Sequence, residues 1–306
     1  MPDAIDAMRD AFTKVANGAG DLPHRLTLAD GTAIAMMARG SASAGTAIKV
    51  VSVRETNHGS SIPTIHAVVV WLDASTGEPT LLIEGASVTG LRTGAASGLA
   101  TDLLAPPTAE VLAVVGAGGQ APDQIRGVLS VREISEIRIC SRGGDSARLL
   151  ARQLADEFPH VQLEVTPDVA SAVRDAHVVC CATTAKEPLL ARADLGERVH
   201  VNAIGSYRPE MRELERELLA HASIVAVDQR LASLSEAGEV IDAIEHAALS
   251  QESLVELGEL IATPPDEING LTVFKSVGLA MQDWAIAQLV SERIGGLDDV
   301  VDVHLR

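Results

Sequence analysis

Aromatic residues are scarce in this chain of 306 residues, since Phe, Trp and Tyr together make up only 2% of it. The side chains of Ala, Val, Leu and Ile must therefore fill the core. Hydrophobic residues reach 47% of the chain, which is enough for a substantial core. Few aromatic rings also leave no platform on which nucleic-acid bases could stack.

Positive charge is also in short supply. The chain has 24 Lys and Arg against 42 Asp and Glu, which gives a formal net charge of −18. Such a surface repels phosphate backbones and anionic lipid, so we expect neither nucleic acid nor a membrane as a partner. No uninterrupted apolar run approaches the length of a membrane span.

Cysteine is limited to Cys140, Cys180 and Cys181, which show neither a disulfide framework nor the C-x-x-C spacing of a metal site. Free buried thiols are typical of a reducing compartment. The histidines within residues 200–246 show no metal-ligand spacing, so we expect no metal. The first residues, Met-Pro-Asp-Ala-Ile-Asp, have neither the basic nor the apolar region of a signal peptide. Together these features predict a cytoplasmic protein.

The most informative segment that is present begins with an apolar run, Val111–Val115, which predicts a buried strand. A turn follows with Gly116, Gly118 and, three residues on, Ala121, and Pro122–Ser130 then predicts the start of a helix. This order is typical of a dinucleotide-binding turn, because glycine lets backbone N–H groups approach a pyrophosphate at a helix N-terminus. The alternative is a tight turn that binds no ligand.

The remaining pattern divides the chain in two. Residues 3–16 predict a helix. The runs that follow predict an antiparallel sheet with a hairpin turn at 75–79. These runs are Ala33–Ala38, Thr46–Val53, Thr64–Asp73 and Thr80–Ile83. A helix over Ser87–Leu104 comes next. After residue 110, strands alternate with helices, which predicts an α/β fold with a parallel, doubly wound sheet. The predicted strands are 111–115, 136–140, 162–165, 177–182, 199–204 and 223–227, and 271–276 with a helix over 278–294 come last.

The end of the second parallel strand distinguishes NAD from NADP, because an acid there binds the ribose 2′-hydroxyl and an arginine binds a 2′-phosphate. Ser141 and Arg142 follow this strand, so NADP(H) is favoured over NAD(H). Alternatively, Arg142 is a solvated loop arginine and Asp145 is reached by a different turn. Asp145 fits this role less well, because we expect it to be the N-cap of the next helix.

The chain resembles the ornithine cyclodeaminase/μ-crystallin family along nearly its whole length. The motifs that carry the resemblance are Pro23-His-Arg25, Ile48-Lys-Val50, Thr89-Gly-Leu-Arg-Thr-Gly-Ala-Ala96, Val115-Gly-Ala-Gly-Gly-Gln-Ala121, Val201-Asn-Ala-Ile-Gly205, Arg212-Glu-Leu214 and Val273-Phe-Lys-Ser-Val-Gly278. The resemblance implies a homodimer. It also implies a Rossmann-type dinucleotide-binding domain, residues 107–278, inserted into an α+β substrate-binding and dimerisation domain, residues 1–106 and 279–306.

The resemblance also implies a small imino or amino acid substrate, with Arg25 and Arg92 on its carboxylate and Lys49 beside the reacting nitrogen or carbonyl. A guanidinium binds a carboxylate through two hydrogen bonds. Lys49 lies in an apolar strand, where desolvation lowers a lysine pKa and suits it to proton transfer. The alternatives are an exposed Arg25, a strand-edge Lys49 and a helix-surface Arg92. Asp283 is expected in a packing ion pair.

Cofactor contacts follow from the same motifs. Thr93 would contact the cofactor phosphate, or else act as a helix cap. The loops after the fourth and fifth parallel strands would flank the nicotinamide. The full set of expected cofactor residues is Thr93, Gly116, Gly118, Gln120, Ala121, Ser141, Arg142, Ala182, Thr183, Ile204 and Ser276.

One position departs from the cyclodeaminases and archaeal alanine dehydrogenases of the family, which carry an acid/base aspartate two residues after the glycine of Asn-Ala-x-Gly. Tyr207 stands there instead, and a phenol with an ordinary pKa near 10 is a poor base at neutral pH. The Ser-x-Arg-Pro version resembles the μ-crystallin and Δ1-pyrroline-2-carboxylate reductase branch. That branch implies NAD(P)H-dependent reduction of a cyclic imino acid to proline or pipecolate. The alternatives are an oxidative deaminase, acting on ornithine or alanine, and an NADPH-dependent binding protein like μ-crystallin.

Overall fold

A computed structural model describes residues 1–57, 62–296 and 300–301 of the chain. The chain divides into two compact units. The parallel-sheet unit consists of residues 1–17 and 90–279, and the antiparallel-sheet unit consists of residues 18–89 and 280–306. Within the described residues, none of the helices has the length and apolar character needed to cross a bilayer.

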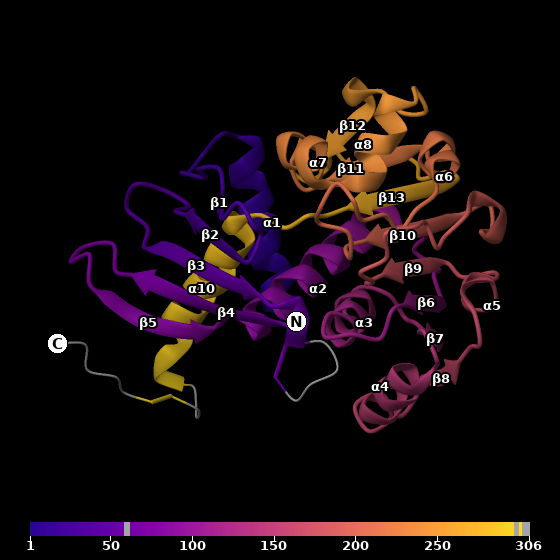
Figure 1. The fold of residues 1–306 in the computed structure, drawn as a ribbon, viewed down its shortest axis with the longest axis horizontal. Helices are drawn as coiled ribbons and strands as arrows, with labels where there is room; N and C mark the ends of the chain where they lie inside the picture. The colour runs from indigo at the N-terminus through magenta and orange to yellow at the C-terminus, as the bar shows by residue number, and fades with distance from the viewer. Residues whose placement is uncertain (58–61, 297–299, 302–306) are drawn as a thin grey trace. The chain divides into compact units, whose positions relative to one another are not determined.

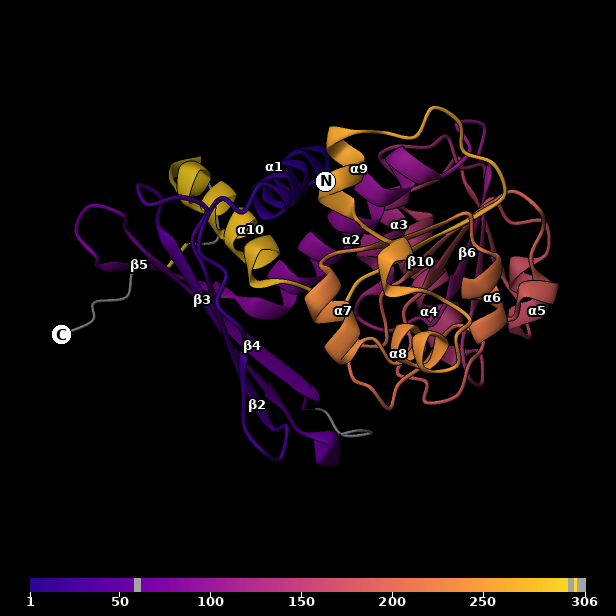
Figure 2. The same cartoon turned by 90° about the horizontal axis from the view of Figure 1, so that it is seen from above.

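The antiparallel-sheet unit is built on five strands in the order β1-β2-β3-β4-β5 (Figure 1). The strands are β1 Leu26–Thr27, β2 Ala33–Ala38, β3 Thr46–Val53, β4 Ile65–Leu72 and β5 Pro79–Glu84. Helix α10, Ala280–Arg293, packs against one face of this sheet (Figure 2). The Trp284 indole donates a hydrogen bond of 2.9 Å to the Gly45 carbonyl and thereby joins α10 to the start of β3. A short 3-10 turn, η1 Glu55–Asn57, follows β3.

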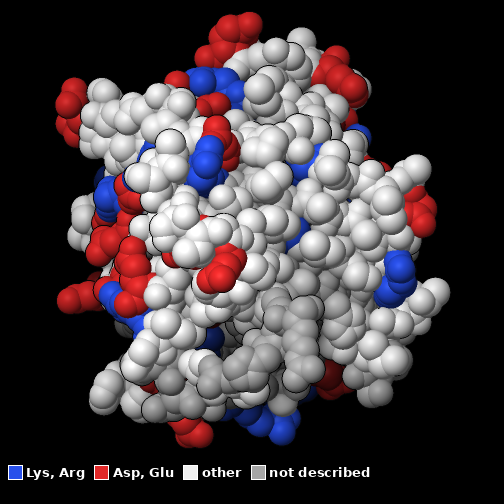
Figure 3. All heavy atoms as spheres, turned by 90° about the vertical axis from the view of Figure 1, so that its left-hand side faces the viewer, with Lys and Arg blue, Asp and Glu red and all other residues white. Residues whose placement is uncertain are grey.

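The opposite face of this sheet carries exposed apolar side chains. Met37, Val50, Val68 and Leu82 are between 38% and 54% exposed, and Val50 lies directly opposite Val68 in the strand register. Figure 3 views the molecule from the side of this unit, and most of the face it shows consists of uncharged residues. A row of this kind is unusual on the surface of a monomeric protein.

The parallel-sheet unit contains eight strands in the order β12-β11-β13-β10-β9-β6-β7-β8, and every pairing among them is parallel (Figure 1). The strands are β6 Val111–Val115, β7 Glu136–Cys140, β8 Gln162–Val165, β9 Val178–Cys181, β10 Val199–Ala203, β11 Ile224–Val227, β12 Leu254–Glu256 and β13 Leu271–Lys275. From β6 the chain runs outward through β7 and β8 and then returns to β9 on the other side. Doubly wound sheets bind ligands at this reversal point, outside the carboxyl ends of the strands.

Helices cover this sheet: α1 Pro2–Ala16, α2 Gly85–Leu104, α3 Ala121–Leu129, α4 Asp145–Ala155, α5 Val169–Val173, α6 Arg216–His221, α7 Arg230–Glu236, α8 Gly238–Glu245 and α9 Leu257–Ala262. The 3-10 turns η2 Arg192–Asp194, η3 Gln251–Ser253 and, after α10, η4 Ile294–Gly296 complete the elements. The core between β6, β7 and α3 consists of aliphatic side chains such as Leu112, Ile125 and Ile137. This composition agrees with the scarcity of aromatic residues.

Glycines let α2 and α3 approach each other closely. A Cβ atom on Gly94 would lie 2.1 Å from the Asp123 carbonyl oxygen, and one on Gly127 would lie 2.0 Å from the Gly94 carbonyl oxygen. A Cβ on Gly90 would lie 2.3 Å from Asp123 Oδ2. The two helix backbones are therefore in direct contact, and α2 fixes the position of the first turn of α3.

The α/β fold class, with its parallel sheet and separate antiparallel sheet, is confirmed. The predicted strands match those of the structure to within a residue or two, but β12 and the segments between β10 and β13 were not predicted in detail. Residues 1–17 and 90–106 lie in the parallel-sheet unit, whereas the predicted substrate-binding and dimerisation domain includes all of residues 1–106. The contacts of α1 with α9 and of α2 with α3 explain this difference. Residues 297–299 and 302–306 of the predicted C-terminal segment lie outside the described residues.

Candidate functional site

The glycine turn after β6 has the geometry of an anion-binding turn. Gly116 adopts a φ of +100°, and a Cβ on it would lie 2.5 Å from the Ala182 carbonyl oxygen, so the packing of the protein itself requires this glycine. Gly118 and Gly119 are exposed, and a Cβ on either would meet no atom within 4 Å. These two glycines therefore leave open space beside the start of α3, which is where a pyrophosphate needs close access to the backbone.

Helix α3 begins at the end of this turn. Ala121 is fully buried, as expected for the residue that packs the helix onto the sheet, and Pro122 occupies the first turn. Gln120 is the N-cap but makes no side-chain capping hydrogen bond. Its Oε1 atom is buried and has no hydrogen-bond partner among the described residues. A buried unsatisfied oxygen is uncommon, which makes Gln120 a candidate for a ligand contact.

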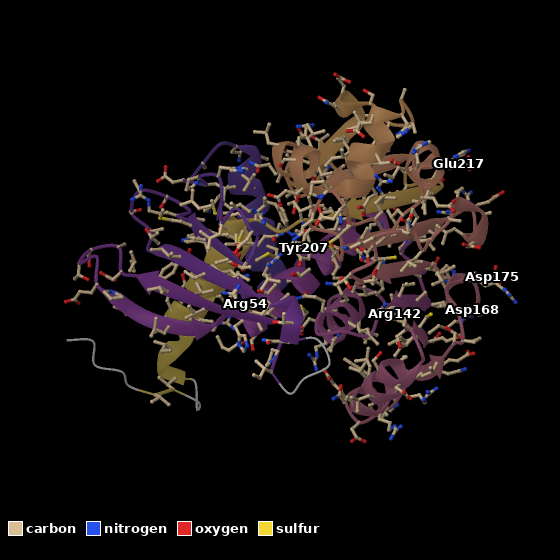
Figure 4. The ribbon with its side chains drawn as sticks, viewed as in Figure 1. Arg54, Arg142, Asp168, Asp175, Tyr207 and Glu217 are labelled. Carbon is tan, nitrogen blue, oxygen red and sulfur yellow. The ribbon has the colours of Figure 1, made fainter. Side chains whose placement is uncertain are left out.

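The first two residues after β7, Ser141 and Arg142, differ in their contacts. Ser141 Oγ accepts hydrogen bonds from Ser146 Oγ at 2.9 Å and from the Ala147 N–H at 3.2 Å, so it organises the first turn of α4. Arg142 is exposed directly after the strand (Figure 4). The Arg142 guanidinium and the Ser141 hydroxyl are therefore the polar side-chain groups at this end of β7.

The expectation that Asp145 is the N-cap of α4 is wrong. Gly144 is the N-cap, with a φ of +75° that favours glycine, and Asp145 is the first helical residue. The Asp145 carboxylate is exposed and accepts a hydrogen bond of 2.7 Å from Arg148. Asp145 is therefore engaged with a cation of its own helix.

Buried Glu213 joins the loops after β9 and β10. Its carboxylate accepts hydrogen bonds from the Thr183 N–H at 2.7 Å, from Thr183 Oγ1 at 2.9 Å and from the Gly205 N–H at 2.7 Å. Burial raises the pKa of the Glu213 carboxyl above its ordinary value. Ala182 and Ile204, which adjoin these two anchored residues, are thereby held at the carboxyl ends of neighbouring strands. Glu213 belongs to the Arg212-Glu-Leu214 motif but is not among the predicted site residues.

A second buried cluster fixes the segment that precedes Tyr207. Lys275 Nζ donates hydrogen bonds of 2.6 Å to both the carbonyl oxygen and the hydroxyl of Ser206, and it forms an ion pair of 3.3 Å with Glu239. All three side chains are buried. Tyr207 follows directly (Figure 4), and the Arg208 guanidinium carbon lies 5.4 Å from the centre of its ring.

Lys49 lies in the antiparallel-sheet unit, on the face of β3 that α10 covers. It is only 3% exposed, and its Nζ donates hydrogen bonds to Thr89 Oγ1 at 2.6 Å and to Asp283 Oδ1 at 2.8 Å. Strand β3 lies between β2 and β4, so the alternative of a strand-edge lysine is wrong. The expected ion pair of Asp283 is confirmed, with Lys49 as its partner. The Asp283 carboxylate is therefore the buried counter-charge of Lys49.

Arg92 and Thr93 are both buried residues of α2 in the parallel-sheet unit. A Cβ on Gly278 would lie 2.7 Å from both Nη atoms of Arg92, so Arg92 is not the exposed helix-surface arginine considered above. Thr93 lies well inside α2, which begins at Gly85, so the alternative of a helix cap is wrong. Arg25 is half-buried and directly precedes β1 of the antiparallel-sheet unit.

Ser276, an expected cofactor residue, is buried at the carboxyl end of β13. Its hydroxyl donates a hydrogen bond of 3.0 Å to Asp228 Oδ2. Within the parallel-sheet unit, the expected cofactor residues other than Thr93 therefore follow the carboxyl ends of β6, β7, β9, β10 and β13. The sequence analysis named the motifs that contain Glu213 and Lys275 but could not pair them, because their partners lie in other parts of the chain.

Several known proteins are similar in sequence to this chain. The chain is 34% identical to Delta(1)-pyrroline-2-carboxylate reductase of Bacillus cereus over 250 residues, which cover 80% of this chain and 76% of that protein. It is 33% identical to ketimine reductase mu-crystallin of Mus musculus over 243 residues, 79% of this chain and 74% of that protein.

Two solved structures are also similar. Thermococcus litoralis Delta(1)-pyrroline-2-carboxylate reductase, in complex with NADH and L-proline, matches with a TM-score of 0.89 and 28% identity, covering 95% of this chain and 92% of that one. An archaeal alanine dehydrogenase dimer with bound NAD matches with a TM-score of 0.88 and 28% identity, covering 96% and 92%. The sequence profile of the Ornithine cyclodeaminase/mu-crystallin family matches residues 1–297. The chain belongs to this family.

Proposed function

We propose that this protein is an NAD(P)H-dependent oxidoreductase that reduces the C=N bond of a cyclic imino acid. The substrate is Δ1-pyrroline-2-carboxylate or Δ1-piperideine-2-carboxylate, and the product is proline or pipecolate. The observation that carries the proposal is Tyr207, which stands where the oxidative enzymes of the family have a carboxylate. The relatives named above as reductases, one of them solved with NADH and L-proline, support the same reaction.

The described residues fit a nicotinamide nucleotide. Its pyrophosphate would bind at the turn of Gly116, Gly118 and Ala121, where the open space beside the exposed glycines and the positive end of α3 favour an anion. When bound in its reduced form, the nucleotide supplies the hydride that the imine carbon accepts. We propose NADP(H) over NAD(H), because exposed Arg142 can bind a 2′-phosphate and Asp145 is engaged with Arg148.

The substrate carboxylate would be bound by Arg92 and Arg25. A planar guanidinium forms two parallel hydrogen bonds with a carboxylate and thereby orients the ring that carries it. Burial of Arg92 strengthens such a charge-assisted contact, since fewer water molecules compete for it. Orientation of this kind contributes a large part of the rate in hydride transfer.

Lys49 would donate the proton that the imine nitrogen gains as the carbon gains hydride. Asp283 is the counter-charge of Lys49, and an ammonium group is a proton donor. Water returns the proton to Lys49 after each turnover. Tyr207 offers no carboxylate to take a proton from a substrate ammonium, a step that oxidation of an amino acid needs.

We also propose that the protein is a homodimer in the cytoplasm. The exposed apolar face of the antiparallel sheet, around Val50 and Val68, has the character of a subunit interface. The similar archaeal alanine dehydrogenase is a dimer. Three free buried cysteines, Cys140, Cys180 and Cys181, suit a reducing compartment.

The test is NADPH or NADH oxidation, followed by absorbance, with each of the two cyclic imino acids offered separately. We expect oxidation with at least one ring, and a lower KM for NADPH than for NADH. The same protein should release no ammonia from ornithine and should not reduce NAD with L-alanine. Ammonia release without any imine reduction would replace this proposal with the oxidative alternative.

A further inference from the structure

Asp228 is a buried carboxylate at the carboxyl end of β11 whose hydrogen bonds all lead to backbone or hydroxyl donors of two loops. Its Oδ2 accepts from Ser276 Oγ at 3.0 Å, from the Val277 N–H at 2.9 Å and from the Gly278 N–H at 2.7 Å. Its Oδ1 accepts from the Gln229 N–H at 2.9 Å. One oxygen therefore organises three consecutive residues after β13.

The loop held in this way lies against Arg92. Gly278 adopts a φ of +83°, and a Cβ on it would lie 2.7 Å from Nη1 and Nη2 of Arg92 and 3.0 Å from its Cζ. The guanidinium therefore rests against the Cα of Gly278, and no other residue type leaves it that space. Any displacement of residues 276–278 transfers directly to the Arg92 head group, because the group is buried and closely packed.

We infer that Asp228 is a positioning residue for Arg92: it holds the 276–278 loop against the guanidinium and thereby sets its orientation toward the substrate carboxylate. This inference rests on the proposed function, in which Arg92 binds that carboxylate. The Val273-Phe-Lys-Ser-Val-Gly278 motif then forms the end of β13 and also supplies the loop that orients Arg92. The Ser276 hydroxyl, which the sequence analysis expected at the cofactor, is committed to Asp228.

The chemistry of the carboxylate explains why an aspartate is needed. Four donors, three of them backbone N–H groups, converge on its two oxygens, and only an ionised carboxylate accepts on both. Asn at this position would turn its amide N–H2 toward one of these donors. Hydrogen bonds to a charged group contribute about 1.5–3 kcal/mol, so the loop would rearrange rather than keep such a contact.

The experiment compares Asp228→Asn, Gly278→Ala and Ser276→Ala with the unaltered protein. Three quantities are measured: KM and kcat for the preferred cyclic imino acid, the dissociation constant of NADPH by fluorescence titration, and inhibition by pyrrole-2-carboxylate, a flat ring with a carboxylate that cannot be reduced. We expect KM and the inhibition constant to rise together, by about 10- to 100-fold in Asp228→Asn and Gly278→Ala. Ser276→Ala, which removes one of the three donors to Asp228 Oδ2, should raise both by about 3- to 10-fold.

NADPH affinity and kcat should change by less than about threefold in Asp228→Asn and Gly278→Ala. Asp242→Asn is the matched control, because Asp242 is a buried carboxylate of the same unit that binds Arg212 and Arg216 instead of the loop. An unchanged KM in Gly278→Ala, or a parallel loss of NADPH affinity, would overturn the positioning role. If the unaltered protein reduced no cyclic imine, the proposed function would fail and this inference with it. If it is active but the variants keep its KM, only the inference fails.

Discussion

Lys49 and Asp283 lie 234 positions apart in the sequence and still form a buried ion pair of 2.8 Å. In Asp283→Asn the ammonium form of Lys49 loses its counter-charge, so the lysine releases its proton at a lower pH. Activity that depends on the protonated lysine is lost as the pH rises through the lysine pKa. We therefore expect the upper pH midpoint of kcat to move to lower pH in this variant.

The measurement is the pH profile of kcat under saturating NADPH and imino acid. Asp10→Asn is the control, since it removes an exposed carboxylate from another lysine ion pair, that of half-buried Lys14. Thermal unfolding verifies that the variant is folded, because removing one partner of a buried pair is destabilising. An unchanged upper pH midpoint of kcat would contradict a role of Asp283 in the proton transfer.

At the scale of elements, the contact between α2 and α3 connects the helix that carries Arg92 to the start of α3, where we propose that the nucleotide binds. Gly94→Ala would place a methyl group 2.1 Å from a backbone oxygen of Asp123, which cannot move as a side chain would. Alanine favours helix by about 1 kcal/mol over glycine, but overpacking costs about 1–3 kcal/mol. We expect a net loss in the free energy of unfolding, measured by urea denaturation, together with weaker NADPH binding because the first turn of α3 is displaced.

Gly196→Ala is the control for this prediction, because a Cβ there would meet no atom within 4 Å and its φ is not positive. It should leave both stability and NADPH binding within experimental error of the unaltered protein. If Gly94→Ala were as stable as this control and bound NADPH equally well, the helix contact would not position the nucleotide turn.

Elements with a strong local signal were predictable. The run from Val111 to Ala121 combines an apolar strand, a glycine turn and a helix start within eleven residues, and each part depends on neighbours in sequence. The register of β13 between β10 and β11 was not predictable, because parallel pairing depends on contacts between distant segments. The same reason applies to Asp228 and Glu213. Their carboxylates are recognisable in the sequence as residues of a motif or a strand end, but their hydrogen-bond partners are not.

At the scale of the whole molecule, charge and apolar surface act on association in opposite directions. A formal charge of −18 makes two copies repel each other, whereas the exposed apolar row on the antiparallel sheet favours their association. Salt screens the repulsion and leaves the apolar contact largely unaffected. Dimerisation through this face should therefore strengthen as the ionic strength rises toward about 0.15 M.

Val68→Asp tests this interface directly. Val68 lies opposite Val50 on the exposed face of the sheet, and a buried aspartate without a partner would cost several kcal/mol in each copy. We expect analytical ultracentrifugation to show a dimer for the unaltered protein and a monomer for Val68→Asp at micromolar concentration. Leu149→Asp is the matched control, because Leu149 is an exposed leucine on α4 of the parallel-sheet unit and its replacement should leave the dimer intact. A dimer that survived Val68→Asp would show that the interface lies on another surface, because an aspartate at the centre of an apolar contact would lose its hydration.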